Sequence, residues 1–411
     1  MAGRAEAEKL DRSNELSRFR ERFYIPPGTI YMDGNSLGLL STDAEKSLLR
    51  RLDEWKNLGI GGWLKEEKPW FVVAEETGKL ASRLVGAEKN EVIFTGTTTV
   101  NIHNLTGTFF QPDGKRNKIL ADQLNFPGDL YALQGQLRMK NLDPRSHLIL
   151  AGPDRNGLLD EDAIIGLMGE DVSMVFLPSV LYRSGQLLDM ERLTAAAHER
   201  GINIGFDCCH SAGIVPHRLS EWGVDFALWC SYKYLNAGPG AAAFLYINKK
   251  HHNLLPSLPG WFGQEKAKQF EMLPEFNPAA HAGRWQISTP GILGSAPMEG
   301  ALQITLEAGM ERIRATSLRL TGFLYDSIMT RIIPADNRFV LLTPREQHCR
   351  GGHIALQHPR ADDIYNDLLS RGIVTDLRPP NIIRIAPSPL YNTFAEIDKV
   401  VGSLLETAAE Y

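Results

Sequence analysis

The residue with the clearest chemical potential is Lys233, which lies in the run SYKYLNAGPG (231–240) between two apolar stretches. A lysine that forms an imine with an aldehyde must be held near-buried, so that its amine is partly neutral. A flat ligand also needs glycine backbones that let it approach closely. The aromatic neighbours of Lys233 and the Gly-Pro-Gly turn after it supply these conditions. A lysine considered alone is more often a solvated surface residue, so this interpretation needs partners elsewhere in the chain.

A carboxylate stands at the end of another apolar run, 26 residues before this lysine. The run INIGFD ends in Asp207, and His210 follows three residues later. Ligands of open α/β sheets bind beyond the carboxyl ends of strands. A carboxylate there can pair with a protonated pyridine nitrogen, which keeps a pyridine ring electron-poor and able to act as an electron sink. Asp207 could instead cap a helix, but its spacing to Lys233 favours the cofactor role.

Two further segments suit the same ligand. FTGTTT (94–99) lies between a predicted strand and a predicted helix, where hydroxyls and the N–H groups of a helix N-terminus can hold a phosphate. NFPGD (125–129) places Phe126 where its ring can stack on a flat cofactor. An ordinary capped turn and a core phenylalanine are the alternatives for these two segments. All four features together predict a pyridoxal phosphate enzyme in which Lys233 carries the cofactor as a Schiff base.

One sheet must position these features. From about residue 90 to 250, short apolar runs alternate with segments of helical period, a pattern typical of βαβ units around a parallel sheet. We expect seven strands, at 91–95, 118–121, 147–151, 173–177, 203–207, 226–230 and 241–248. We expect helices among them at 127–139, 160–168 and 190–200.

The pattern changes after Pro290. A long helix is expected over 298–331, followed by the strand-like runs FVLLTP and HIALQHP, a helix over 361–371, the strand IIRIAP and a final helix. This order predicts a smaller α+β domain joined to the first by the long helix. We expect an N-terminal segment at 1–60 that packs on the small domain or on a partner, a large α/β domain at 61–295, and the small domain at 296–411.

Composition narrows the class of protein. The chain of 411 residues is 43% hydrophobic and carries 44 basic and 49 acidic residues, for a net charge of −5. These values favour a globular protein with a sizeable core, and they give no reason to expect a nucleic-acid or membrane partner. Four cysteines and a charged N-terminal segment indicate a reducing, cytoplasmic setting. Cys349 with His348 and His353 lacks further ligands at regular spacing, so no metal site is expected.

Longer motifs resemble one family over nearly the whole chain. They include YMDGNSLGLL (31–40), FPGD (126–129), FDCCHSAG (206–213), WGVDFALWCSYKYLNAGPG (222–240), GWFG (260–263) and APSPLYN (386–392). In these motifs the chain resembles the kynureninases. The resemblance implies an aminotransferase-like fold of pyridoxal phosphate fold type I, a homodimer with shared active sites, and hydrolysis of L-kynurenine to anthranilate and L-alanine, a carbon–carbon bond hydrolase activity (EC 3.7.1.3) of tryptophan catabolism.

The resemblance also assigns roles by matched position. It implies three catalytic residues, namely Lys233, Tyr232 and Asp207. It implies cofactor contacts from Thr98, Thr99, Phe126, Asp129, His210 and Tyr232, with Trp261 and Thr289 supplied by the partner subunit. It implies substrate contacts from Trp63, Arg384, Asn35 and Ser36, with Arg384 gripping the substrate carboxylate.

Two positions bear on substrate choice, and one departs from the family pattern. Family members that prefer 3-hydroxykynurenine tend to carry His and Asn where this chain carries Trp63 and Thr289, so a preference for kynurenine is expected. Pro178 stands where the family usually has a Ser or Thr hydroxyl that helps to bind the cofactor, and Ser179 follows it. Because proline has neither a hydroxyl nor an N–H, that contact is expected to be absent or shifted by one residue.

Two alternatives remain open on sequence grounds. A cysteine desulfurase of the same fold would need a reactive cysteine on a mobile loop, for which Cys349 in REQHCRGGH is the candidate. A catalytically silent homologue would act as a binding or regulatory module. The presence of both Lys233 and Asp207 favours an enzyme.

Overall fold

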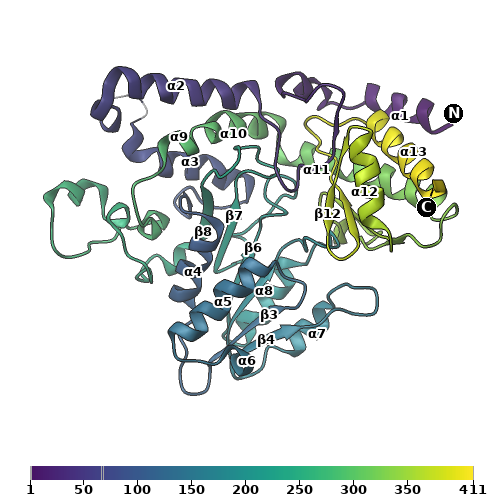
Figure 1. The fold of residues 1–411 in the computed structure, drawn as a ribbon. Coiled ribbons are helices and arrows are strands. Elements are labelled where there is room, and N and C mark those ends of the chain that lie inside the picture. The colour runs from purple at the N-terminus through teal and green to yellow at the C-terminus, as the bar shows by residue number, and fades with distance from the viewer. Residues whose placement is uncertain (1, 66, 68, 411) are drawn as a thin grey trace.

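A seven-stranded sheet forms the centre of the larger part of the molecule (Figure 1). The computed structural model describes residues 2–65, 67 and 69–410. The strands run in the order β2-β8-β7-β6-β5-β3-β4, and only β8 runs antiparallel to its neighbours β2 and β7. Their bounds are β2 (Val92–Phe94), β3 (Lys118–Asp122), β4 (Leu148–Ala151), β5 (Val172–Pro178), β6 (Asn203–Asp207), β7 (Phe226–Cys230) and β8 (Ala243–Ile247). The predicted seven-stranded, mainly parallel sheet is confirmed.

Helices cover both faces of this sheet, which explains why its strands are apolar runs without alternation. Every residue of β7 and β8 is buried. Apolar side chains of α4 (Thr98–Phe109) and α5 (Pro127–Met139) pack on one face. Those of α8 (Met190–Glu199) and α10 (Pro297–Ala308) pack on the other. The remaining helices here are α3 (Val73–Ala81), α6 (Pro144–His147), α7 (Glu161–Gly166) and α9 (Ile292–Ser295).

The prediction of one long helix over 298–331 is wrong, because the helix is interrupted at Gly309. Gly309 has φ +80, a left-handed conformation that glycine adopts without strain, and it separates α10 from α11 (Met310–Ser327). A π-helical turn, Ile328–Ile332, continues α11. The break lets α10 pack on α2 (Thr42–Leu58) beside the large sheet, while α11 packs on α13 (Phe394–Glu410).

A smaller antiparallel sheet lies in the C-terminal part, in the order β12-β13-β10-β9. Its strands are β9 (Val340–Leu341), β10 (Ile354–Gln357), β12 (Asp376–Arg378) and β13 (Ile382–Ile385). With α11, α12 (Ala361–Ser370) and α13 it forms a separate apolar core. The expected smaller α+β unit is therefore present.

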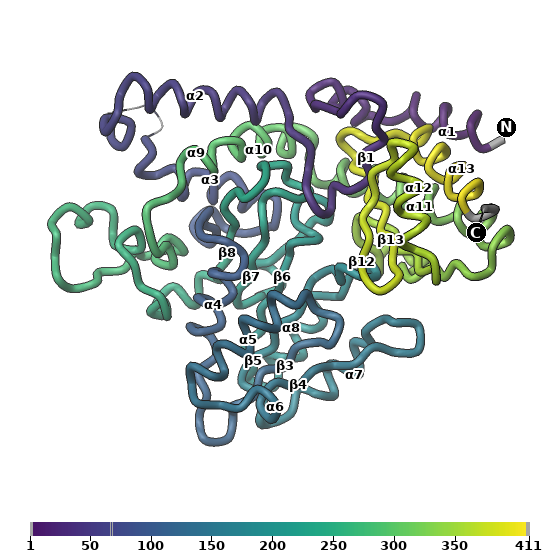
Figure 2. The backbone as a smooth tube through the Cα atoms, viewed as in Figure 1, coloured from purple at the N-terminus to yellow at the C-terminus, as the bar shows by residue number. Residues whose placement is uncertain are grey.

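The N-terminal segment divides between the two parts of the molecule. Figure 2 shows it lying along the C-terminal elements, where α1 (Ala2–Arg12) packs on α13 and β1 (Ile30–Tyr31) pairs in parallel with β11 (Ile373–Val374). Helix α2 then crosses to the large part and packs on α10. The domain boundaries at 60 and 295 remain predictions.

Short 3₁₀ helices complete the described chain. They are Ser17–Arg22, Gly59–Trp63, Trp70–Val72, Ser82–Leu84, Lys249–His251, Trp261–Gly263, Lys266–Glu271, Ala282–Trp285 and Gln347–Cys349. Within the described residues, every helix is too short or too polar to cross a membrane.

Candidate active site

A cavity of about 270 Å³ lies beyond the carboxyl ends of the central strands. Strand β6 ends in Asp207, and the turn that carries Lys233 follows β7. Most of the site residues expected from sequence line this one cavity: Asn35, Ser36, Thr98, Thr99, Phe126, Asp129, Asp207, His210, Tyr232, Lys233 and Arg384. Segments up to 349 residues apart in the chain thus meet here because strand ends of an α/β sheet share one edge.

Lys233 lies on the cavity wall with its amine against His210. Its Nζ is 2.9 Å from His210 Nε2. Burial, and then the nearby Lys233 ammonium, lower the pKa of His210 well below its usual range, so the ring is neutral and can accept this hydrogen bond. Burial also disfavours the charged lysine, but the neighbouring side chains of Cys230, Cys209 and Asp207 outweigh this effect and raise the pKa of Lys233.

Two carboxyl groups share the floor of the cavity. Asp207 is buried, and its Oδ1 accepts a hydrogen bond of 2.7 Å from the backbone N–H of Cys209. Burial, followed by the neighbouring Asp207, raises the pKa of Asp129 well above its usual range. Asp129 Oδ2 has no protein partner among the described residues. Asp129 therefore stays protonated, and the carboxyl group of Asp207 lies beside it at the end of β6, where it can face a cationic ring nitrogen.

The part of the cavity wall formed by the start of α4 suits an anion. Thr98 and Thr99 begin α4, where the N–H groups of a helix's first turn lack carbonyl partners within the helix. Tyr232 lies nearby on the cavity wall. Burial, and then the Cys230 and Cys209 thiols, raise the pKa of Tyr232, so its phenol stays protonated and can donate a hydrogen bond.

The small sheet supplies a guanidinium to the cavity. Arg384 on β13 is 1% exposed and forms an ion pair with Asp376, which lies directly opposite it on β12. Its Nη2 donates to Ser36 Oγ at 3.0 Å, and its Nη1 donates to the carbonyl of Tyr182 at 2.9 Å. These contacts fix the guanidinium at the junction of the small sheet with the N-terminal segment.

The loop 33–38 docks against the lysine turn. The N–H of Gly38 donates to the carbonyl of Tyr232 at 2.7 Å, and a Cβ at Gly38 would lie 2.4 Å from the carbonyl of Lys233. Only glycine permits this approach. The docked loop presents Asn35, which is fully buried and whose amide N and O both lack a protein partner among the described residues. Such a side chain is available to a ligand.

Three predicted site residues do not line this cavity within the chain. Trp63 packs against Trp70 and Phe262, with ring centroids 5.6 and 6.1 Å away. Trp261 packs edge-on against Phe262 and is half exposed. Thr289 lines a different cavity, of about 400 Å³. The roles given to these residues remain predictions.

Sequence reasoning missed Tyr182 and Arg378, which also line the cavity. The ring of Tyr182 meets that of Phe126 edge-on, at 5.6 Å and 87°. Arg378 stands two residues after Asp376 on β12 and therefore on the same face of the strand. The sequence signal for Arg378 was the alternation of Asp376 and Arg378 in a short strand, which places both charged side chains on one face.

The serine beside Pro178 does not replace the missing hydroxyl. Ser179 is fully buried, and its Oγ lies 2.6 Å from Ser211 Oγ and 3.1 Å from the carbonyl of Asp207. It supports the end of β6 from behind and is not among the residues that line the cavity. Pro178 itself pairs in register with Asp207.

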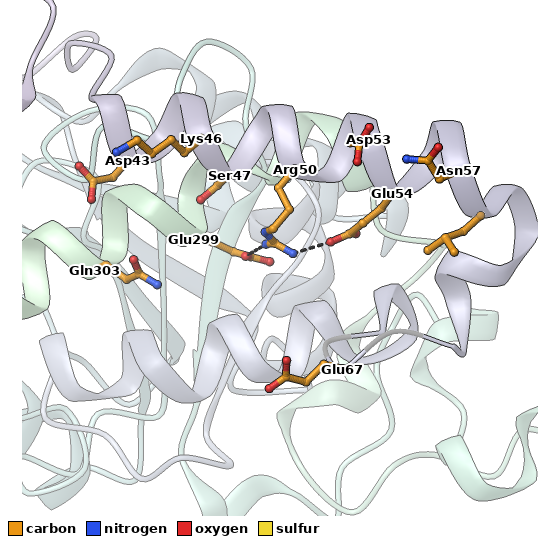
Figure 3. A pocket seen from close by; sticks show the side chains of 11 residues that line it. Asp43, Lys46, Ser47, Arg50, Asp53, Glu54, Asn57, Glu67, Glu299 and Gln303 are labelled. Atoms are coloured by element: carbon orange, nitrogen blue, oxygen red, sulfur yellow. Dashed lines mark hydrogen bonds and ion pairs between the residues drawn. The ribbon is translucent and has the colours of Figure 1, made fainter.

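Two other cavities hold different chemistry. Cys349 lines one of about 580 Å³ that does not include Lys233, and burial, followed by Glu346 and Glu161, raises the pKa of its thiol. A cavity of about 630 Å³ between α2 and α10 is lined by charged groups that pair with one another, such as Arg50 with Glu54 and Glu299 (Figure 3). Neither arrangement provides an activated thiol or a lysine at a strand end.

Comparison with known proteins identifies the family. The chain is 53% identical to the kynureninase of Bacillus anthracis over 391 residues, which are 95% of this chain and 91% of that protein. It is 52% identical to the kynureninase of Geobacillus thermodenitrificans, over 96% of this chain and 92% of that one. The chain belongs to the kynureninase family. In agreement, residues 313–404 match the family model for the kynureninase C-terminal domain.

Solved structures of more distant proteins share the fold. An apo cysteine desulfurase from Thermococcus onnurineus has a TM-score of 0.79 at 18% identity, covering 96% of this chain and 98% of that one. A C-DES variant with glycine covalently linked to its pyridoxal phosphate cofactor has a TM-score of 0.79 at 17% identity, over 94% and 99% of the two chains. These likenesses confirm the aminotransferase-like, fold-type-I architecture. At this low identity the likeness concerns the fold alone, so it gives no reason to assign desulfurase activity to this kynureninase-family chain.

The cavity residues of this family member fit pyridoxal phosphate. Lys233 offers an amine for a covalent link, Asp207 a carboxylate for the ring nitrogen, and the start of α4 a site for the phosphate. Phe126 is half exposed at the cavity, where its ring is free to stack on a flat ligand. Asp129, His210 and Asn35, each with a buried polar atom that has no partner among the described residues, line the same cavity.

Proposed function

We propose that this protein is a pyridoxal phosphate-dependent kynureninase, which hydrolyses the Cβ–Cγ bond of L-kynurenine to give anthranilate and L-alanine. One observation carries the proposal: Lys233, Asp207 and Arg384 line a single cavity in a chain more than half identical to kynureninases. Membership of the family supplies the reaction, and the cavity supplies residues that can perform it.

Several residues of the chain have separate roles in the first step, the removal of the Cα proton. Arg384, held by Asp376, binds the substrate carboxylate and orients the Cα–H bond toward Lys233. Pyridoxal phosphate, when bound, supplies the electron sink that stabilises negative charge at Cα. Lys233 Nζ then takes the Cα proton, and His210 beside it keeps the amine directed into the cavity. Asp207 lies at the end of β6 where its carboxyl group can pair with the ring nitrogen, next to Asp129, whose pKa is raised by burial.

Tyr232 serves the hydrolytic step. Its protonated phenol donates a hydrogen bond to the γ-carbonyl oxygen of the substrate, which makes Cγ more electrophilic toward water. After water adds at Cγ, the Cβ–Cγ bond breaks, Cγ leaves as the carboxylate of anthranilate, and Cβ takes a proton to become the methyl group of alanine. Water is the only co-reactant, and atoms balance.

We further propose a homodimer in the cytoplasm. Trp63, Trp261 and Thr289 do not line the Lys233 cavity of their own chain, so a second copy would have to supply them. Exposed apolar side chains such as Trp55, Phe270 and Met272 support an interface in this part of the molecule. All four cysteines are free thiols, which supports a reducing compartment.

The direct test is to add L-kynurenine to the purified holoenzyme and follow anthranilate fluorescence. The wild-type protein should release anthranilate, while Lys233→Ala should lose both turnover and the absorbance of the lysine-linked cofactor. Lys89→Ala, at an exposed lysine, is the matched control and should behave as wild type. Cofactor binding without any anthranilate release would contradict the proposal, and sulfide release from cysteine that is lost in Cys349→Ala would replace it.

Substrate preference is tested separately. Because the resemblance to the kynureninases assigns Trp63 and Thr289 to the two discriminating positions, kcat/KM should be higher for kynurenine than for 3-hydroxykynurenine. The double variant Trp63→His with Thr289→Asn should shift the ratio toward the hydroxylated substrate. A wild-type ratio that already favours 3-hydroxykynurenine would contradict this part of the proposal.

A further inference from the structure

Three charged side chains lie on one face of the small sheet, and two of them line the cavity. Asp376 lies opposite Arg384 in the β12–β13 register, and Arg378 follows Asp376 by two residues on the same strand. Residues two apart on a strand point to the same side of a sheet. Both arginines line the Lys233 cavity, so two guanidinium groups, not one, face the substrate space.

Arg384 has already committed most of its hydrogen-bond donors to the protein. A guanidinium carries five N–H groups. In Arg384, Nε and Nη2 contact Asp376, Nη2 also donates to Ser36, and Nη1 donates to the carbonyl of Tyr182. These contacts leave one N–H, which is too few for the paired hydrogen bonds by which an arginine grips a carboxylate. Arg384 therefore needs help to hold a substrate carboxylate firmly.

Arg378 has the donors that Arg384 lacks. Its Nε forms an ion pair with the same Asp376 at 2.9 Å, and its Nη2 reaches Ser36 Oγ only at 3.5 Å. Although it lies close to Asp376, this buried Nε makes no hydrogen bond among the described residues, so its N–H is available to a ligand. The side chain is 34% exposed, whereas that of Arg384 is 1% exposed, so Arg378 is the more accessible of the two from the cavity.

The charges around Arg378 and Arg384 also favour the binding of a carboxylate. Two guanidinium groups share the single carboxylate of Asp376. The nearby Asp33 compensates only in part, because burial raises its pKa to about 7. The corner of the cavity thus carries unbalanced positive charge, which one carboxylate of a ligand would neutralise.

We propose that Arg378 is a second carboxylate-binding residue, which together with Arg384 selects amino-acid substrates that have a free α-carboxylate. Asp376 holds the two guanidinium groups side by side, and the unpartnered amide of Asn35 completes the site. This inference rests on the proposed function and adds a residue that determines which ligands the site accepts.

The test measures binding by calorimetry in the holoenzyme, with L-alanine and L-alaninamide as probes. The two differ in the negative charge that Arg378 would contact. Arg378→Met should weaken L-alanine binding by about tenfold or more, the worth of a charge-assisted hydrogen bond, and change alaninamide binding by less than about twofold. For kynurenine, KM should rise by a similar factor while kcat changes little.

Arg338→Met is the matched control. Arg338 also follows an aspartate partner by two residues, since it pairs with Asp336 at 2.8 Å, but it does not line the cavity. It should bind both probes as the wild type does. Equal losses of alanine and alaninamide in Arg378→Met would mean that Arg378 only supports Arg384, and unchanged alanine binding would mean that it contacts no carboxylate. Either result overturns this inference, whereas failure of the wild type to release anthranilate contradicts the proposed function instead.

Discussion

At the scale of single residues, burial sets the protonation state of the site. It raises the pKa of Tyr232 and Asp129 and lowers the pKa of His210, so that a phenol, a carboxylic acid and a neutral imidazole line the cavity together with Asp207. Each group is thereby available as the donor or acceptor that its proposed role needs. Pairs of groups whose environments separate their pKa values are typical of acid–base sites.

Asp122 gives a pH-dependent prediction for stability. Strand β3 ends in this fully buried residue, and burial raises its pKa to about 7 although its Oδ1 accepts an N–H from Leu124. Because the unfolded carboxyl ionises near pH 4, the folded state binds more protons between about pH 4 and 7, so stability falls as pH rises through that window. In Asp122→Asn this loss should disappear. The change in the free energy of unfolding from pH 5 to pH 8 should therefore be more favourable in the variant than in the wild type, by on the order of 2 kcal/mol.

Urea unfolding of both proteins at the two pH values measures this difference. Asp53→Asn, at an exposed carboxylate, is the control and should keep the pH dependence of the wild type. An Asp122→Asn variant that loses as much stability as the wild type between pH 5 and 8 would show that Asp122 is ionised in the folded protein at both values.

At the scale of elements, the site depends on the contact between the loop 33–38 and the lysine turn. A Cβ on Gly38 would lie 2.4 Å from the Lys233 carbonyl, and that backbone cannot move without shifting the lysine. Gly38→Ala should therefore lower kcat/KM by about tenfold or more, since small misplacements of reacting groups cost large factors in rate. Anthranilate release and the cofactor's absorbance measure the effect.

Gly402→Ala is the control for this prediction. It lies in α13, and a Cβ there meets nothing within 4 Å. The variant should keep full activity, because alanine is the better helix former. Wild-type kcat/KM in Gly38→Ala would mean that the loop can withdraw without disturbing Lys233.

Sequence reasoning succeeded where local signals decide the outcome. The seven strands were predictable because each is an apolar run bounded by turns, and the residues at their carboxyl ends then meet at one edge. The break at Gly309 was missed because a glycine inside a helical pattern is often tolerated. The pairing of Asp376 with Arg384 was not predictable, because the register of β12 on β13 depends on packing that no short pattern encodes.

At the scale of the whole molecule, some of the expected site residues lie outside the Lys233 cavity of their own chain. Trp261 and Thr289 do not line the Lys233 cavity. The segment between β8 and α9, residues 248–291, contains Trp261 and projects from the large part of the molecule (Figure 1). Trp261, Phe270 and Met272 are all at least half exposed on or beside this segment. Apolar side chains gathered in this way are typical of a surface that another chain covers.

A mixing experiment tests whether two copies share each site. Lys233→Ala removes the covalent link to the cofactor, and Trp261→Ala removes a residue expected to act on the partner's site, so each variant alone should have little activity. In a hybrid dimer of the two, one site would combine Lys233 of the first chain with Trp261 of the second and be intact, while the other site would lack both. Equal co-expression makes half of the dimers hybrid, so roughly a quarter of wild-type activity should return.

Two Lys233→Ala chains carrying different tags serve as the control and should recover nothing. If the hybrid, isolated by its two tags, is as inactive as its parents, Trp261 acts within its own chain or not at all, because only sites built from both subunits can be restored by exchanging them.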